Sequence, residues 1–77
     1  MNIQKKIFQI ITELSAFDNL NEGMLLVEDI GFDSMEMVIL LVTIEDEFDI
    51  SLSQSDMDPF AIKTIGDVID LVEKYDE

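Results

Sequence analysis

Apolar residues recur at helical spacing in three separate stretches of this chain. The first stretch, about Asn2 to Ala16, places its apolar residues on one face, at Ile3, Ile7, Ile10, Ile11 and Leu14. The second runs from Ser34 to Phe48. The third begins at Thr64 and has a face to be buried at Ile65, Val68, Ile69 and Val72. A chain of 77 residues has room for one small core, so we predict a single all-α domain over residues 1–77.

The connections between these helices differ in length. The polar stretch from Phe17 to Asp33 is longer than most loops, so we expect it to be functional or to contain a short turn of helix. Residues Asp49–Ser53 are predicted to be a connector. A short helix is predicted around Ser55–Phe60, where Pro59 limits its extent. The predicted architecture is therefore a small four-helix bundle with a long first loop and a short third helix.

Two of the helix starts have a capping pattern. Asp33 is followed three residues later by Glu36, which predicts a capping box with Asp33 as the N-cap of the second helix. Ser34 could cap that helix instead, because predicted boundaries are uncertain by a residue or two. Thr64 and Asp67 repeat the pattern at the start of the last helix.

The second helix has more apolar surface than one small core needs. At about 100° per residue its apolar side chains form two stripes on nearly opposite sides. One stripe consists of Met37, Leu40, Leu41, Ile44 and Phe48; the other consists of Met35, Val38, Ile39 and Val42, bordered by Glu45 and Asp46. A helix buried on both sides is one interpretation, but it is geometrically difficult in so small a domain. We therefore predict that the second stripe and its bordering acids dock a partner protein.

Acidic residues outnumber basic residues 18 to 4, which gives a net charge of −14. No basic residue lies between Ile7 and Ile62, and that part of the chain holds 13 acidic residues. Such a surface repels nucleic acid and anionic membranes and suits basic partner proteins. The simpler interpretation is that the charge only keeps a monomer in solution.

Histidine and cysteine are both absent. The usual general base near neutral pH is therefore missing, as is the commonest metal ligand, so we predict that the chain is not an enzyme and has no metal site. Without cysteine there is no disulfide, which suits a reducing cytoplasm. The N-terminal residues MNIQKKIFQIITEL lack the features of a signal peptide, and no apolar run is long enough to span a membrane. We expect a cytoplasmic protein.

Residues 31–35, Gly-Phe-Asp-Ser-Met, resemble the Gly-x-Asp-Ser-Leu motif of the acyl carrier protein family, which includes peptidyl carrier proteins. The likeness continues through DSMEMVILLVTIEDEFDISL, residues 33–52, with its acidic run at 45–47. The C-terminal TIGDVIDLVEKY also matches, so the resemblance covers essentially the whole chain. Asp-Ser alone is weak evidence, whereas Asp-Ser at the start of such an apolar and acidic helix is a specific signal.

This resemblance implies that a phosphopantetheinyl transferase attaches 4′-phosphopantetheine from coenzyme A to Ser34, where helix N–H groups can meet the phosphate. The thiol of that cofactor holds acyl or aminoacyl groups as thioesters for fatty-acid, polyketide or nonribosomal-peptide biosynthesis. In the family, the aspartate at the position of Asp33 also contributes to recognition by the transferase. Loading, condensing and processing enzymes with basic docking surfaces are the other implied partners. The docking residues are expected to be Met35, Glu36, Val38, Ile39, Val42, Glu45 and Asp46.

Two positions depart from the family pattern. Met35 stands where leucine is usual, which is a mild change because the volumes are similar. Ile39 occupies a position that is often acidic in fatty-acid carriers, so it removes a charge from the expected docking face. This departure leaves the pathway open without weakening the expected carrier role.

The sequence does not meet the requirements of two other classes of protein, calcium-binding modules and hydrolases. The best frame for a calcium loop begins at Asp49, but it puts Gln54 where a glycine belongs and Phe60 where a bidentate glutamate is required. A hydrolase would need a base and a nucleophile-elbow motif, and neither is present. The best alternative is an acidic helical adaptor that binds a basic partner without covalent modification. The two hypotheses differ in what they predict for Ser34, which is covalently modified in a carrier and unmodified in an adaptor.

Overall fold

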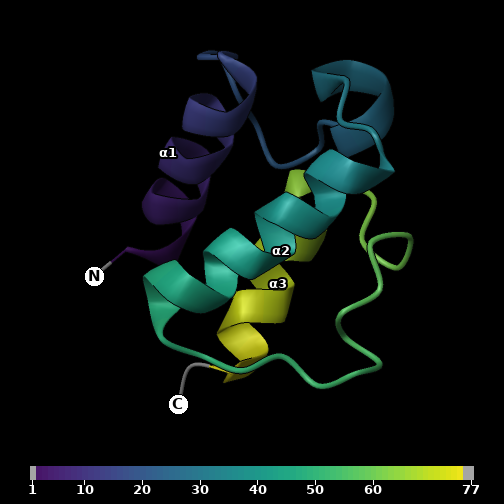
Figure 1. Ribbon diagram of the computed structural model, residues 1–77. Helices are drawn as coiled ribbons and strands as arrows, with labels where there is room; N and C mark the ends of the chain where they lie inside the picture. Colours follow the sequence, from purple (N-terminus) through teal and green to yellow (C-terminus); the bar gives the residue numbers. More distant parts are fainter. Residues whose placement is uncertain (1, 76–77) are drawn as a thin grey trace.

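The computed structural model describes residues 2–75, which form four helical segments joined by irregular connections (Figure 1). The segments are α1 (Ile3–Ser15), η1 (Leu26–Ile30), α2 (Ser34–Phe48) and α3 (Ile65–Tyr75), and η1 is a single turn of π-helix. No strand occurs in this range; the nearest feature is one isolated bridge between Leu25 and Thr64. The predicted all-α class and the three helical stretches are confirmed.

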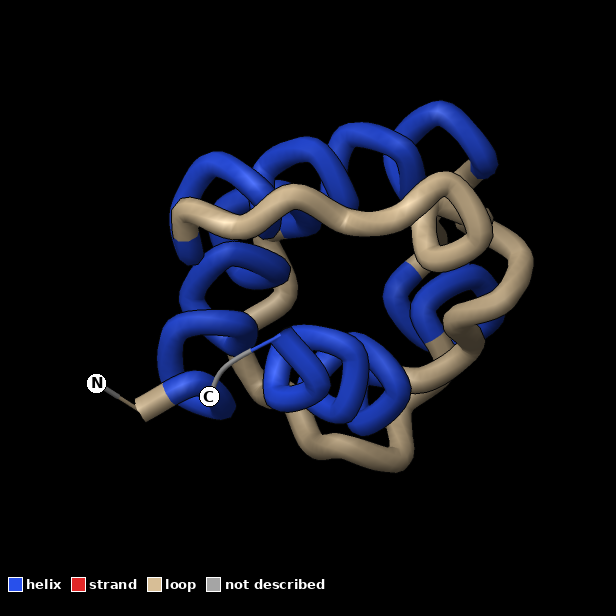
Figure 2. The backbone as a smooth tube through the Cα atoms, turned by 90° about the horizontal axis from the view of Figure 1, so that it is seen from below, coloured by secondary structure: helices blue, strands red, loops and turns tan. Residues whose placement is uncertain are grey.

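The helices enclose one apolar interior. Helix α1 contacts both α2 and α3. Seen from below, α1 and η1 lie on opposite sides of the space between α2 and α3 (Figure 2). The buried side chains come from all four segments and from two connections: Ile7, Ile10, Ile11, Leu26, Ile30, Phe32, Met37, Leu40, Leu41, Ile44, Ile62, Ile65, Val68, Ile69, Leu71 and Val72. None of the described polar or charged residues is buried, so apolar burial holds the bundle together.

The long first connection contains η1, as the length of the loop predicted. The N–H groups of Ile30 and Gly31 donate to carbonyl oxygens five residues earlier, over 3.1 Å each, which defines the π turn. The carboxylate of Asp29 accepts from the N–H of Leu25 at 2.8 Å. Gly31 ends the turn with φ of +94°, a backbone conformation that glycine adopts without steric cost.

Backbone hydrogen bonds fix η1 against the start of α3. The N–H of Leu26 donates to the carbonyl oxygen of Lys63 at 2.8 Å, and the N–H of Ile65 donates to that of Met24 at 3.1 Å. Helix α3 begins at a capping box, because the N–H of Asp67 donates to Thr64 Oγ1 and the N–H of Thr64 donates to the Asp67 carboxylate, both at 3.1 Å. These bonds hold η1 beside the N-terminus of α3.

The short helix predicted around Ser55–Phe60 is not formed; the segment makes turns instead. Ser53 Oγ accepts from the N–H of Asp56, and the Asp58 carboxylate accepts from the N–H of Phe60, so side chains take up N–H groups that a helix would use. Pro59 adds a further interruption. The fourth helical segment of the bundle is therefore η1.

The connection between α2 and α3 is fastened to the end of α3 by side chains. Both carboxylate oxygens of Asp56 accept from Lys74 Nζ, at 2.8 and 3.0 Å, and the Tyr75 hydroxyl donates to the same carboxylate. The N–H of Ser53 donates to the Tyr75 oxygen at 2.9 Å. We call this group, Ser53, Asp56, Lys74 and Tyr75, the C-terminal clasp.

Candidate functional site

The N-terminus of α2 is set by a complete capping box. Asp33 has extended backbone geometry, and its carboxylate accepts from the N–H of Glu36 at 2.8 Å. The Glu36 carboxylate in turn accepts from the N–H of Asp33 at 3.3 Å. The predicted cap is confirmed, and the alternative that Ser34 caps the helix is wrong, because Ser34 is the first residue inside it.

Ser34 is exposed at this helix start. Its hydroxyl has no hydrogen-bond partner among residues 2–75, and neither do the N–H groups of Ser34 and Met35. Two free N–H groups at the positive end of a helix dipole form a favourable environment for a phosphate. The residues present therefore fit a phosphodiester on the Ser34 oxygen.

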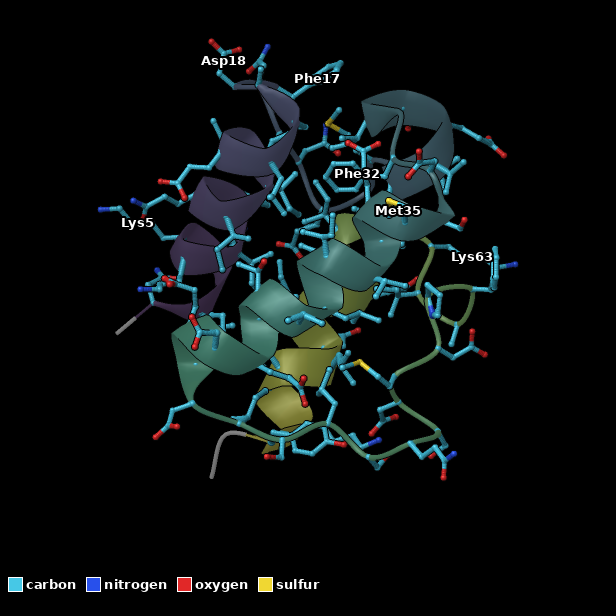
Figure 3. The ribbon with its side chains drawn as sticks, viewed as in Figure 1. Lys5, Phe17, Asp18, Phe32, Met35 and Lys63 are labelled. Carbon is cyan, nitrogen blue, oxygen red and sulfur yellow. The ribbon has the colours of Figure 1, made fainter. Side chains whose placement is uncertain are left out.

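Phe32, two residues before Ser34, anchors the chain at the start of α2. Phe32 is buried, and its N–H donates to the carbonyl oxygen of Leu26 at 3.0 Å. Figure 3 shows Phe32 toward the interior and Met35 on the outer side of α2. The loop thus holds the start of α2 rigidly while leaving Ser34 open to an approaching protein.

The two predicted stripes of α2 differ in burial as expected. Met37, Leu40, Leu41 and Ile44 are buried, and Phe48 is partly buried. The other stripe is open, with exposed fractions of 72% for Met35, 45% for Val38, 44% for Ile39 and 51% for Val42. We call these four residues the α2 apolar stripe; they lie on the same helix as Ser34, beginning at the next residue.

Glu45 and Asp46, the acidic residues expected to border this stripe, and the adjacent Glu47 differ in their contacts. Glu45 is partly buried, and its carboxylate accepts from the N–H of Leu52 at 2.8 Å. Glu47 pairs with Lys6, whose Nζ lies 3.1 Å from its carboxylate. Asp46 is exposed and has no side-chain partner in the range the structure describes. Glu45, Asp46 and Glu47 are adjacent in the sequence, and only the folded structure shows which of them has a bonding partner.

Among the hollows in the part of the chain that the structure describes, two are lined mostly by apolar residues. A pocket of about 230 Å³ lies between η1 and the connection before α3, and its lining includes the exposed side chains of Val27 and Phe60 together with Glu28 and Lys63. A second pocket, of about 510 Å³, lies where α1, α2 and α3 meet and is lined by Ile3, Glu47, Phe48, Asp49, Ile50, Val72 and Tyr75. Periodicity within single helices carries no information on such spaces between segments.

Three groups away from Ser34 have shifted pKa values. Hydrogen bonds from Lys74 and Tyr75 lower the pKa of Asp56, and the Asp56 partner raises the pKa of Lys74. Backbone N–H bonds from Lys63 and Thr64 lower the pKa of Asp67. All three shifts favour the charged form, and their causes are structural bonds of the clasp and of the α3 cap.

A family model, related sequences and a solved structure all match this chain and point to the same family. Residues 6–72 match the family model described as a phosphopantetheine attachment site. An acyl carrier protein of Thermotoga maritima is 32% identical over 74 residues, which cover 94% of this chain and 89% of that protein. One from Chlamydia caviae is 29% identical over 75 residues, covering 95% of each. A solved structure from Mycobacterium tuberculosis, described as "a putative acyl carrier protein", superimposes with a TM-score of 0.86 at 35% identity, covering 96% of this chain and 99% of that one.

Proposed function

The chain belongs to the acyl carrier protein family, whose members bear a covalently attached phosphopantetheine, and from this premise we propose that Ser34 Oγ is the attachment atom and that the chain carries acyl or aminoacyl groups. The observation that supports this choice of residue is the exposed hydroxyl of Ser34 at the first position of α2, beside two free N–H groups. When the group is bound, the Ser34 and Met35 N–H groups would hold its phosphate, and Asp33 would hold the turn that presents them.

The attached group supplies a thiol at the end of a flexible arm, on which cargo is held as a thioester. The chain has no histidine to activate the Ser34 hydroxyl, so a base of the transferase would take its proton, while the diphosphate bond of coenzyme A breaks and adenosine 3′,5′-bisphosphate leaves. The chain is thus a carrier and not a catalyst in this proposal. Its cargo is handed between enzymes of fatty-acid, polyketide or nonribosomal-peptide biosynthesis in the cytoplasm.

The test is modification of the purified protein with coenzyme A and a broad-specificity phosphopantetheinyl transferase, followed by intact mass spectrometry. We expect the wild-type chain to gain the mass of one phosphopantetheinyl group and Ser34→Ala to gain nothing. Ser51→Ala, at an exposed serine after α2, is the matched control and should be modified normally.

Two outcomes would contradict the proposal. Modification of Ser34→Ala would place the group on another residue. If the wild-type chain is never modified, the alternative remains: an acidic helical adaptor that binds a basic partner through the α2 apolar stripe, without a prosthetic group.

A further inference from the structure

The pocket of about 510 Å³ lies at the end of α2 that is far from Ser34. Ser34 and Phe48 are the first and last residues of that helix, which at about 1.5 Å per residue places them roughly 21 Å apart. Figure 1 shows the end of α2 near the start of α1 and the end of α3. A pocket of this volume is typical of a small-molecule site, and it is separate from the start of α2.

Hydrogen bonds of the fold hold the walls of this pocket in place. Tyr75 belongs to the C-terminal clasp, where its oxygen accepts from the N–H of Ser53 at 2.9 Å. Directly after α2, the N–H groups of Asp49 and Ile50 both donate to the carbonyl oxygen of Glu45. Because these walls are already ordered, a ligand would not have to order them on binding.

The lining combines apolar side chains with one unpaired carboxylate. Two of its residues are acidic, Glu47 and Asp49. Glu47 pairs with Lys6 at 3.1 Å, whereas Asp49 is exposed and has no side-chain partner within residues 2–75. The rest of the lining is apolar or aromatic: Ile3, Phe48, Ile50, Val72 and Tyr75. The pocket therefore offers an apolar surface beside a single unpaired negative charge.

The electrostatics at this end of the bundle favour a cation. Asp49 directly follows α2, at the negative end of that helix dipole. Helix α1 begins near the same pocket with the positive end of its dipole, but Asn2 Oδ1 already accepts from the N–H of Lys5 at 3.1 Å, and Lys6 is paired with Glu47. The net charge of −14 also attracts cations and repels anions.

We propose that this pocket binds a small molecule that has one ammonium group on an apolar body. The ammonium lies against the Asp49 carboxylate, and the apolar body contacts Phe48 and Ile50. A ligand with a carboxylate head would bring like charges together at Asp49 and is disfavoured. The site goes beyond the proposed function, because it uses neither Ser34 nor the prosthetic group.

The probe is octylammonium, titrated into the unmodified full-length chain and into Ser34→Ala, which lacks the proposed attachment oxygen. Amide NMR spectra should give the same Kd for both, about 1 mM or tighter, with the largest shifts at Asp49, Ile50 and Tyr75. Octanoate, which has a similar chain and the opposite charge, should bind at least about tenfold more weakly. Butylammonium, which lacks four of the methylene groups, should also bind at least about tenfold more weakly.

Two matched variants test the role of the carboxylate. Asp49→Asn should weaken octylammonium binding about three- to tenfold, because it removes the charge and keeps the shape. Asparagine also tolerates the φ of +54° at this position, so the turn after α2 is kept. Asp46→Asn removes an exposed, unpaired carboxylate at the same end of α2 that does not line the pocket, and should change Kd by less than about twofold. Circular dichroism melting of each variant shows that the bundle is folded.

The outcomes separate this site from the other features of the chain. Equal binding of octanoate and octylammonium would overturn the proposal, and so would equal losses for Asp49→Asn and Asp46→Asn, since the Asp49 charge would then not select the ligand. Shifts centred on the α2 apolar stripe would overturn it by placing the ligand there. Absence of octylammonium binding overturns the pocket and leaves Ser34 as the proposed attachment residue, whereas failure to modify Ser34 leaves the pocket unaffected.

Discussion

At the start of α2, the adjacent residues Asp33 and Ser34 have different roles. Asp33 accepts the hydrogen bond that stabilises the first turn, at 2.8 Å from the N–H of Glu36. The Ser34 hydroxyl accepts and donates nothing within the described chain. The side chain that caps the helix and the free hydroxyl are therefore separate, so the hydroxyl can be removed without losing the cap hydrogen bond.

We predict that Asp33→Ala lowers the free energy of unfolding by about 1 kcal/mol, because one cap hydrogen bond is lost and the N–H of Glu36 is left to water. Ser34→Ala should change it by less than about 0.5 kcal/mol, the usual range for a surface substitution. Urea denaturation followed by circular dichroism measures both. Equal losses for the two variants would show that the serine also stabilises the helix.

Among the elements, the connection from α2 to α3 depends most on side-chain bonds. It has no helix of its own, and the C-terminal clasp fixes it to α3 through Asp56. The pKa of Asp56 is lowered in the folded chain, first by Lys74 and then by Tyr75. A lowered carboxylate pKa stabilises the fold above the unfolded pKa, and this contribution is lost as pH falls through the folded value.

We predict that Asp56→Asn lowers the melting temperature at neutral pH, because it removes the charge that Lys74 and Tyr75 bind. The difference from wild type should begin to shrink below about pH 3.8, where the Asp56 carboxyl of the unfolded chain takes up its proton, and it should vanish as pH falls through the lowered pKa of the folded chain. It should also begin to shrink above about pH 10.5, where Lys74 of the unfolded chain loses its proton, and it should vanish as pH rises through the raised pKa of Lys74 in the folded chain. Thermal melts between pH 2.5 and 11 measure this. A difference that is constant across that range would show that the clasp is not electrostatic.

The sequence predicted the elements whose causes are local. Helices α1, α2 and α3 follow from apolar spacing and from capping residues three positions apart, so their bounds agree with the structure to within about one residue. The Ser55–Phe60 prediction was wrong because local side-chain bonds from Ser53 and Asp58 replace helical ones, and because Asp56 is bonded to residues 18 and 19 positions away, at the end of α3. The π geometry of η1 was likewise not predictable, since η1 is bonded to Lys63 across the fold.

The candidate site was predictable to a different degree at each residue. Asp33 and Ser34 lie in a short motif that the sequence displays directly. The open stripe followed from surplus apolar surface on α2. The hydrogen bond from the N–H of Leu52 to the Glu45 carboxylate could not be predicted, because the chain must turn back after α2 to make it.

At the scale of the whole molecule, the uneven charge is the main feature. Two of the four lysines, Lys6 and Lys74, are paired with acids, so little positive charge offsets the acidic surface. None of the helices in residues 2–75 is long and apolar enough to cross a membrane. The acidic surface favours approach by basic proteins, at rates that depend on ionic strength.

We predict that reversing exposed charge beside the docking surface slows partner association. Of Glu45 and Asp46, the cleaner choice is Asp46→Lys, because Glu45→Lys would also break the bond to Leu52. Association with the transferase should slow by about two- to fivefold at low salt, with a weaker dependence on ionic strength. Stopped-flow measurements between about 20 and 500 mM salt provide the test. Over this range the Debye length goes from roughly two- to threefold longer to roughly two- to threefold shorter than its value at about 0.1 M.

The matched control is Asp70→Lys, the same charge change at an exposed position of α3. It should slow association less, because it lies on a different helix from Ser34. Equal rates for wild type and Asp46→Lys at every salt concentration would show that Asp46 only contacts solvent.

The freedom of the Ser34 hydroxyl has a consequence for the order of events in the life of the protein. Since that oxygen makes no bond inside the bundle, esterifying it removes nothing that the helices need. With the arm on Ser34 as proposed, the polypeptide would be able to finish folding before it is loaded, and to lose and regain the arm without unfolding. The timing of the modification would then depend on the enzyme that reaches the first turn of α2.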